Sequence, residues 1–338
     1  MEIKTTVREG YNHVIIVNNK GMEVEFSSIG ASLYDIIIPN KFGEKVSILL
    51  KPTSMEIFKD KYYGKTIGRF AGRIDKGVCT IAEKEYKLDI NWNGVNSLHG
   101  GFNGLSSQVC EFSTNMTEEY CEVVFKYFEA AGMLPGDVSY EIIYHVMANT
   151  NEIITYHNAT TTEETIVNMT NHAYFNLSGN CKNTILNHNL YLQCSKYTRL
   201  NNDLITLSID PVNEVTDFRD NHHVGIYVED PSLQDHIAKG YDHCFMKEDE
   251  ENPLLAILSD TESGISVKIS SDYPSVVFYS GCYPDPCPMN SDGIESVKYQ
   301  ALCLEPQFIP NGINMENVPQ ALLKPEEKYS HYIKYSFE

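Results

Sequence analysis

Residues 140–156, which read YEIIYHVMANTNEIITY, decide the fold class of this 338-residue chain. Two runs rich in β-branched and aromatic residues, at 140–147 and 152–156, stand on either side of a short polar segment. The side chains of that segment, Asn149, Thr150 and Asn151, are typical of a compact turn. The stretch therefore predicts two strands that follow each other directly along the chain.

Similar patterns continue outward in both directions. Residues 122–127 are another apolar run, and at 22–26 apolar residues alternate with Glu23 and Glu25, which predicts one solvated face. Segments 79–90 and 254–269 resemble hairpins, and alternate residues from 329 to 337 share one apolar face. Helical signals are confined to a short segment that starts at Ser54 as N-cap. We therefore predict an all-β protein, a large antiparallel sandwich that forms a single domain over residues 1–338.

Composition restricts the function. With 26 Lys+Arg against 46 Asp+Glu, the chain carries a net charge of −20, which argues against nucleic-acid and anionic-membrane surfaces. The N-terminus lacks the apolar segment of a signal peptide, and no run approaches the ~18 apolar residues of a membrane span. The nine cysteines have no framework spacing, so we expect reduced thiols in a cytoplasmic protein.

Ionisable residues interrupt the β pattern at five places. They are Arg69 and Arg73 among glycines, His99 before Gly100-Gly101, His172 within a predicted aromatic strand, Asp242 before an apolar strand, and Glu305 after four apolar residues that resemble a buried strand. Each has a structural explanation: solvated turn residues, a histidine bonded to a backbone carbonyl, or a buried ion pair. Burying the Glu305 carboxylate without partners costs several kcal/mol, and such placement is typical of catalytic acids and bases.

The same residues favour acid–base chemistry over other classes. The sequence has no nucleophile elbow, no phosphate-binding loop and no dinucleotide fingerprint. Only His222-His223 and the pair Cys282 and Cys287 resemble metal ligands, and neither has further ligands at a recognised spacing. We therefore expect no metal.

Four motifs, in this order, resemble the aldose 1-epimerase (galactose mutarotase) family: LHGG at 98–101, NHAYFNL at 171–177, Asp242-His243, and LEPQ at 304–307. The resemblance extends from about residue 10 to 335. It implies a galactose mutarotase-like β-supersandwich, no cofactor, and interconversion of the α and β anomers of free aldohexoses such as galactose and glucose. By the same resemblance Glu305 is the general base and His172 the general acid. Arg73, His99, Asp242 and the aromatic Tyr279 hold the sugar.

The resemblance has departures and leaves alternatives. Gly72 stands where many members have Asn, Leu105 and Cys110 replace aromatic residues, and Val277 replaces a Gln found in some relatives. A hexose-6-phosphate mutarotase, a non-catalytic sugar-binding protein and a β-sandwich without ligand remain alternatives. We expect a monomer or a weak homodimer.

The reaction itself sets a requirement on the pair. Ring opening needs a base at the anomeric hydroxyl and an acid at the ring oxygen, each within about 2.6–3.2 Å and on opposite sides of C1. We therefore expect Glu305 to be ionised and His172 protonated near neutral pH. Mutual attraction favours this state, and burial opposes it.

Overall fold

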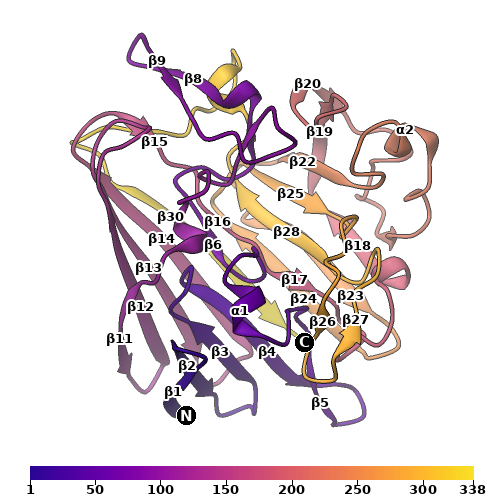
Figure 1. Cartoon of the computed structure of the whole chain (residues 1–338). Coiled ribbons are helices and arrows are strands. Elements are labelled where there is room, and N and C mark those ends of the chain that lie inside the picture. The colour runs from indigo at the N-terminus through magenta and orange to yellow at the C-terminus, as the bar shows by residue number, and fades with distance from the viewer.

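A computed structural model describes residues 1–338, and its sheets are antiparallel throughout (Figure 1). The largest sheet has nine strands. In spatial order they are β11 (Glu111–Met116), β12 (Tyr120–Glu129), β13 (Val138–Met147), β14 (Glu152–Thr161), β30 (Tyr329–Phe337), β24 (Ile265–Ser271), β23 (Leu254–Asp260), β18 (Asn189–Leu192) and β21 (His222–His223). Residues 140–156 lie in β13, β14 and the turn between them. The two strands pair in register from Val138↔Thr161 to Val146↔Ile153.

A six-stranded and a five-stranded sheet complete the main architecture. The six-stranded sheet contains β17 (Tyr174–Phe175), β28 (Leu302–Gln307), β25 (Ser275–Tyr279), β22 (Asp242–Lys247), β19 (Cys194–Leu200) and β20 (Thr206–Pro211). The five-stranded sheet contains β1 (Glu2–Arg8), β2 (Tyr11–Val17), β3 (Glu23–Ser27), β4 (Ser32–Pro39) and β5 (Lys45–Ser47). Figure 1 shows β28, β25 and β22 running side by side on the right, with β11 to β14 on the left.

Short elements connect the sheets. The two-stranded pairs are β6 (Thr66–Ile67) with β16 (Thr170–Asn171), β7 (Arg73–Ile74) with β10 (Ser97–Leu98), β8 (Val78–Ile81) with β9 (Lys84–Lys87), β15 (Thr165–Ile166) with β29 (Leu322–Leu323), and β26 (Pro288–Met289) with β27 (Ile294–Glu295). The helices are α1 (Met55–Phe58), α2 (Pro231–Gln234) and four 3₁₀ turns at Asp75–Gly77, Leu105–Ser107, Ile185–Asn187 and Gly312–Asn314. No helical segment combines the length and the apolar character that crossing a bilayer requires.

The main core is one cluster of 59 buried residues contributed by all three sheets. Strand β13 shows how the sequence builds it, because Tyr140, Ile142, Tyr144 and Val146 alternate with partly exposed residues. Strand β28 differs, since all six of its residues are buried. One face of β28 packs into the core through Leu302 and Leu304, and the opposite face is covered by other parts of the chain. That second face carries the chemistry described below.

Most predicted elements are confirmed, with three local corrections. The predicted helix start at Ser54 is confirmed, since its side chain accepts from the backbone N–H of Glu56. The hairpin predicted over 79–90 ends at Lys87. Glu25, expected on a solvated face, is buried, because Arg8 and His13 pair with its carboxylate at 2.7 and 2.8 Å. His172 lies in the link between β16 and β17 rather than in a strand.

Candidate active site

A cleft of about 270 Å³ opens over one face of the six-stranded sheet. This is near the lower end of the roughly 300–1,000 Å³ found for small-molecule sites. Its lining combines aromatic, charged and amide side chains, among them Tyr62, Arg73, Trp92, His99, His172, Tyr174, Asp242, Cys244, Val277, Tyr279, Tyr283, Glu305 and Gln307. Every residue that the sequence proposed as catalytic or sugar-binding belongs to this lining.

Strand register sets the floor of the cleft. Asp242 lies opposite Tyr279, and Tyr279 lies opposite Cys303, so one row crosses β22, β25 and β28. Two residues further along each strand, Val277 lies opposite Glu305. Since side chains two apart on a strand point to the same face, the chemical groups of three strands converge on one surface.

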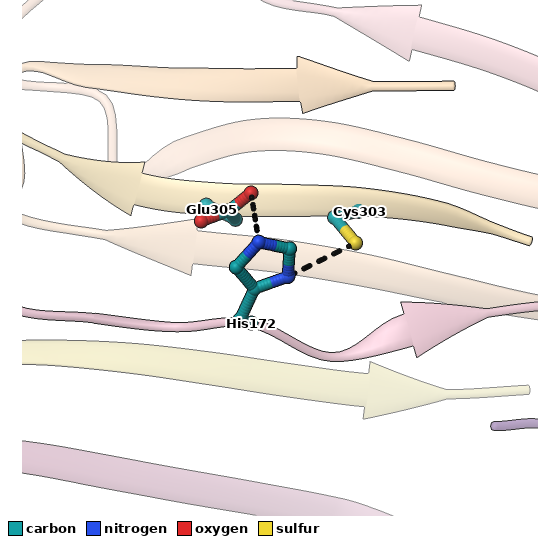
Figure 2. Close-up of side chains that lie close together, drawn as sticks. All are labelled: His172, Cys303 and Glu305. Carbon is teal, nitrogen blue, oxygen red and sulfur yellow. Dashed lines mark hydrogen bonds and ion pairs between the residues drawn. The ribbon is translucent and has the colours of Figure 1, made fainter. Parts of the chain in front are cut away.

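His172 reaches this floor from a different part of the chain. Its backbone N–H donates to the carbonyl of Lys65, and its own carbonyl accepts from Gly64, at 2.9 and 2.8 Å. These two bonds hold the link between β16 and β17 against the segment that precedes β6. The imidazole Nε2 then lies 3.6 Å from Oε1 of Glu305, and both side chains are more than nine-tenths buried (Figure 2).

A second group of polar side chains lies beside the pair. Strand β7 pairs with β10 through Arg73↔Leu98, which brings Arg73 and His99 together. Nδ1 of His99 accepts from the backbone N–H of Gly72 at 3.1 Å, so this nitrogen carries no proton and the ring is in its Nε2–H form. Arg73 donates to Asp242 at 3.0 Å, and its guanidinium lies 4.6 Å from the centre of the Trp92 ring.

Aromatic rings sandwich the imidazole. The ring of Tyr174 stacks on His172 with centroids 4.9 Å apart, and Tyr62 lies nearly parallel to it at 5.9 Å. The ring of His99 meets His172 edge-on at 5.3 Å. These contacts restrict rotation of the imidazole and shield it from water, so its electrostatics are governed by burial.

Burial sets the proton affinities of the two groups in the empty cleft. Desolvation, with a smaller contribution from nearby Arg73, lowers the pKa of His172 to about 3. Desolvation raises the pKa of Glu305 well above its usual range, with Asp242 adding to the rise and Arg73 opposing it. Both directions favour a neutral imidazole and a protonated carboxyl. Burial therefore opposes the ionised Glu305 and protonated His172 that we expected from the sequence.

A metal ion is the other ligand that such residues could hold. The ligand atoms of His172, Cys303 and Glu305 all lie within 4.8 Å of one another. However, Cys303 contacts Nδ1 of the imidazole and Glu305 faces Nε2, and these nitrogens point in different directions (Figure 2). One ion cannot be bound by all three side chains without a rearrangement of the ring or the thiol. The group is therefore arranged as a chain of polar contacts.

The earlier metal-like pairs are engaged elsewhere. Both ring nitrogens of His222 lie within hydrogen-bonding distance of backbone carbonyls, and His223 contacts the carbonyl of Asn187. Cys282 contacts Ser280, whereas Cys287 contacts the sulfur of Met289.

The structure separates residues that sequence alone could not distinguish. Arg69 and Arg73 are four apart, but only Arg73 lines the cleft. Arg69 is buried against Glu129 at 2.9 Å and donates to the carbonyl of Pro135. At Gly72, where φ is +78°, an added Cβ would lie 2.6 Å from Cβ of Pro310. The Asn that the family resemblance leads us to expect at this position therefore does not fit here unless Pro310 moves.

Sequence reasoning missed several lining residues, notably Tyr62, Trp92, Cys303 and Gln307. Two of these four residues could have been predicted from the sequence. Cys303 and Gln307 stand two residues before and after Glu305, so strand periodicity places all three side chains on one face. Trp92 and Tyr62 lie in irregular segments, where no periodicity indicates the direction of a side chain.

The fold and the cleft together define a galactose mutarotase-like β-sandwich with a buried histidine–glutamate pair. Solved structures with this fold include an aldose epimerase homologue from C. elegans, with a TM-score of 0.85 at 24% identity, covering 97% of this chain and 99% of that one. Another is a galactose 1-epimerase from Lactobacillus acidophilus, with a TM-score of 0.85 at 23% identity, covering 100% of this chain and 98% of that one.

Sequence comparison gives the family. The profile of the aldose 1-epimerase family matches residues 12–336. A galactose mutarotase from Mus musculus is 30% identical over 94% of this chain and 91% of its own length. An aldose 1-epimerase from Escherichia coli K12 is 29% identical over 97% of this chain and 95% of its own. The chain belongs to the aldose 1-epimerase family, which confirms the resemblance noted in the sequence and its assignment to this family of enzymes.

Proposed function

We propose that this chain interconverts the α and β anomers of free aldohexoses, galactose and glucose, by opening and closing the pyranose ring. The observation that carries the proposal is the 3.6 Å separation of His172 Nε2 and Glu305 Oε1 at the floor of a small-molecule cleft. Family membership supports it, since relatives of similar length are named galactose mutarotase and aldose 1-epimerase.

The separation of the two groups suits the reacting atoms. The anomeric hydroxyl oxygen and the ring oxygen are both bonded to C1, so a single carbon presents both to the protein. An acid and a base that lie side by side can each reach one of these oxygens within about 2.6–3.2 Å. The pair therefore does not need to stand on opposite sides of C1, as the sequence argument assumed.

The proton transfers balance over the cycle. The step starts from the form of the pair in which the shared proton has moved from Glu305 to His172. Glu305 then takes the proton of the anomeric hydroxyl, His172 gives its proton to the ring oxygen, and the bond from C1 to the ring oxygen breaks. The open aldehyde then faces a protonated carboxyl and a neutral imidazole. This is the state that burial favours for the pair. Burial therefore assists ring opening rather than ring closure. Rotation about the C1–C2 bond, followed by the reverse proton transfers, gives the other anomer.

Two residues that line the cleft carry polar atoms without a partner in the protein. Nε of Arg73 and Oε1 of Gln307 are buried and have no partner within the protein. A buried polar atom without a partner costs about 1–3 kcal/mol, so a ligand that satisfies both atoms is favoured. One is a donor and the other an acceptor, which matches a hydroxyl group that can do both. Arg73, His99 and Asp242 hold the sugar in this proposal, and the face of Tyr279 packs on its C–H groups.

The charges around the cleft favour a neutral sugar over a sugar phosphate. Arg73 is paired with Asp242, and Lys61 is paired with Asp285. A phosphate would have to compete with two carboxylates for these cations. All nine cysteines are free and eight are buried, which suits a reducing compartment such as the cytoplasm. We further propose a single catalytic domain that acts as a monomer or a weak homodimer.

Polarimetry on freshly dissolved sugars tests the proposal. We expect the protein to accelerate mutarotation of α-D-galactose and α-D-glucose above the buffer rate, in proportion to protein concentration. Glucose 6-phosphate at equal concentration should respond less. A rate equal to buffer for every free hexose would exclude catalysis and leave a sugar-binding protein. Faster turnover of the phosphate would move the assignment to a hexose-6-phosphate mutarotase.

A further inference from the structure

The third member of the polar chain, Cys303, is not used by the proposed reaction. It lies on the same face of β28 as Glu305, two residues earlier, and its side chain is fully buried. Its sulfur lies 3.3 Å from Nδ1 of His172 (Figure 2). The opposite ring nitrogen, Nε2, faces Glu305. The imidazole is therefore held between a thiol and a carboxyl.

The reaction dictates which nitrogen keeps its proton. Nε2 must give and take a proton, because it is the nitrogen that faces Glu305 and the cleft. In its neutral form this nitrogen needs a free lone pair, so the remaining ring proton must stay on Nδ1. The side chain within reach of that N–H is Cys303, whose sulfur is a weak acceptor.

A weak acceptor serves this purpose better than a carboxylate. A carboxylate at Nδ1 would stabilise the imidazolium and make His172 a poorer acid. A buried neutral thiol orients the N–H and adds no charge. Burial, together with the nearby Glu305 and Asp242, raises the pKa of the Cys303 thiol well above its usual range, so the sulfur stays neutral. The stacked rings of Tyr62 and Tyr174 restrict rotation of the imidazole, so the sulfur and Nδ1 stay in contact.

We propose that Cys303 is a positioning residue, whose sulfur accepts the Nδ1–H of His172 and thereby keeps Nε2 free to exchange a proton with the sugar. This inference rests on the proposed function, because it assigns a role within that reaction. It differs from a packing role in one respect: it predicts which nitrogen of His172 carries the proton.

Nitrogen-15 NMR on the intact, histidine-labelled protein measures the tautomer directly. The signal of His172 is assigned by its disappearance in the His172→Asn variant. We expect the wild type to carry the proton on Nδ1 at neutral pH. In Cys303→Ala the N–H loses its acceptor, and the Nε2–H tautomer should become populated. A wild-type His172 in the Nε2–H form overturns the proposal, as does an unchanged tautomer in Cys303→Ala.

Kinetics give a second readout that packing alone would not change. We expect Cys303→Ala to lower kcat by about 3- to 10-fold, the range of one neutral hydrogen bond, with KM changed less than twofold. Cys303→Ser restores an acceptor of similar size and should recover most of kcat. Because oxygen is the stronger acceptor, the acid limb of its pH profile should move to higher pH. If alanine and serine lower kcat equally, the inference is wrong.

Two controls separate the possible failures. Cys121→Ala removes an equally buried thiol from β12, outside the cleft, and should leave both kcat and the His172 signal unchanged. Thermal unfolding of each variant checks that the fold is kept. If Cys303→Ala does not fold, the same measurements are made on Cys303→Ser. If the wild type itself does not accelerate mutarotation, the proposed function fails. If the wild type is active but the Cys303 variants keep its kcat and its His172 tautomer, only this inference fails.

Discussion

Arg73 donates a hydrogen bond from Nη2 to Oδ2 of Asp242 at 3.0 Å, and the two side chains are only 12% and 10% exposed. The pair joins the first residue of β7 to the first residue of β22, which belongs to the six-stranded sheet. A buried ion pair of this kind costs little while both partners are present. It becomes costly when one charge is left alone.

Removal of Arg73 should therefore affect both stability and sugar binding. We expect Arg73→Met to lower the free energy of unfolding by about 3 kcal/mol, because the carboxylate of Asp242 stays buried without a partner. The double variant Arg73→Met, Asp242→Asn should recover part of this loss of stability. The single and the double variant should both have a higher KM than the wild type. Urea unfolding and polarimetry give the two quantities. Arg199→Met, which breaks an exposed pair with Asp210, should cost less than about 1 kcal/mol. Equal losses at the two arginines would contradict the account.

The pH profile of activity follows from the proton shared by His172 and Glu305. The reactive pair carries one exchangeable proton. It gains a second when pH falls through the pKa of His172, about 3, and loses its only one when pH rises through the raised pKa of Glu305. The acid limb should therefore lie well below the ordinary imidazole pKa of about 6.5. Initial rates from pH 3 to 10, corrected for buffer, give the profile. An acid limb at the ordinary imidazole pKa argues against the shared proton. A profile with neither an acid nor a basic limb in this range does so as well.

Stability at acid pH has a separate source in the buried histidines. Burial lowers the pKa of His157, like those of His172 and His243, to about 3. Between about pH 6.5 and 3 the unfolded chain binds protons that the folded one excludes, so stability falls as pH falls. His157→Gln should reduce the slope of unfolding free energy against pH by up to about 1.4 kcal/mol per pH unit. Urea titrations from pH 4.5 to 7 measure it. A slope equal to that of the wild type means that His157 titrates normally in the folded state.

Trp92, the only tryptophan, should report ligand binding. It lines the cleft with the Arg73 guanidinium 4.6 Å from its ring centre, and Tyr283 meets it edge-on at 5.8 Å. A sugar that engages Arg73 changes the electrostatic surroundings of the indole. We expect galactose to change the tryptophan fluorescence in a saturable way, with a midpoint close to KM. Galactitol, which cannot form a ring, is the matched control. An equal response to galactitol, or no response to galactose above KM, would show that the sugar does not occupy this part of the cleft.

The fold could be predicted further than the site. Alternation in stretches such as 140–147 identifies strands because burial on one face imposes a period of two. A continuous run of four apolar residues, at 301–304, placed Glu305 in a buried strand. Neither pattern could show that Arg69 and Arg73 have different environments. Arg69 lies in an irregular segment and Arg73 in the two-residue strand β7, and the direction of both depends on distant parts of the chain. The pairing of His172 with Glu305 also depends on tertiary contacts, here the backbone bonds between His172 and the segment at 64–65.

Proton placement in the site depends on a property that the sequence does not give. From the sequence we expected the charged pair, because attraction between His172 and Glu305 favours it and burial opposes it. At 3.6 Å and with both groups more than nine-tenths buried, desolvation strengthens the opposing effect. The depth of burial is a property of the assembled sheets and cannot be read from neighbouring residues.

The exchange rate between anomers at equilibrium tests the central claim most directly. Magnetisation transfer between the anomeric protons of α- and β-galactose measures it without depleting substrate. The account predicts that Glu305→Gln and His172→Asn each reduce the protein-dependent rate by at least about 10²-fold while the fold is retained. The surface variants Glu118→Gln and His223→Asn should match the wild type. A near-normal exchange rate in either Glu305→Gln or His172→Asn would contradict proton transfer by this pair.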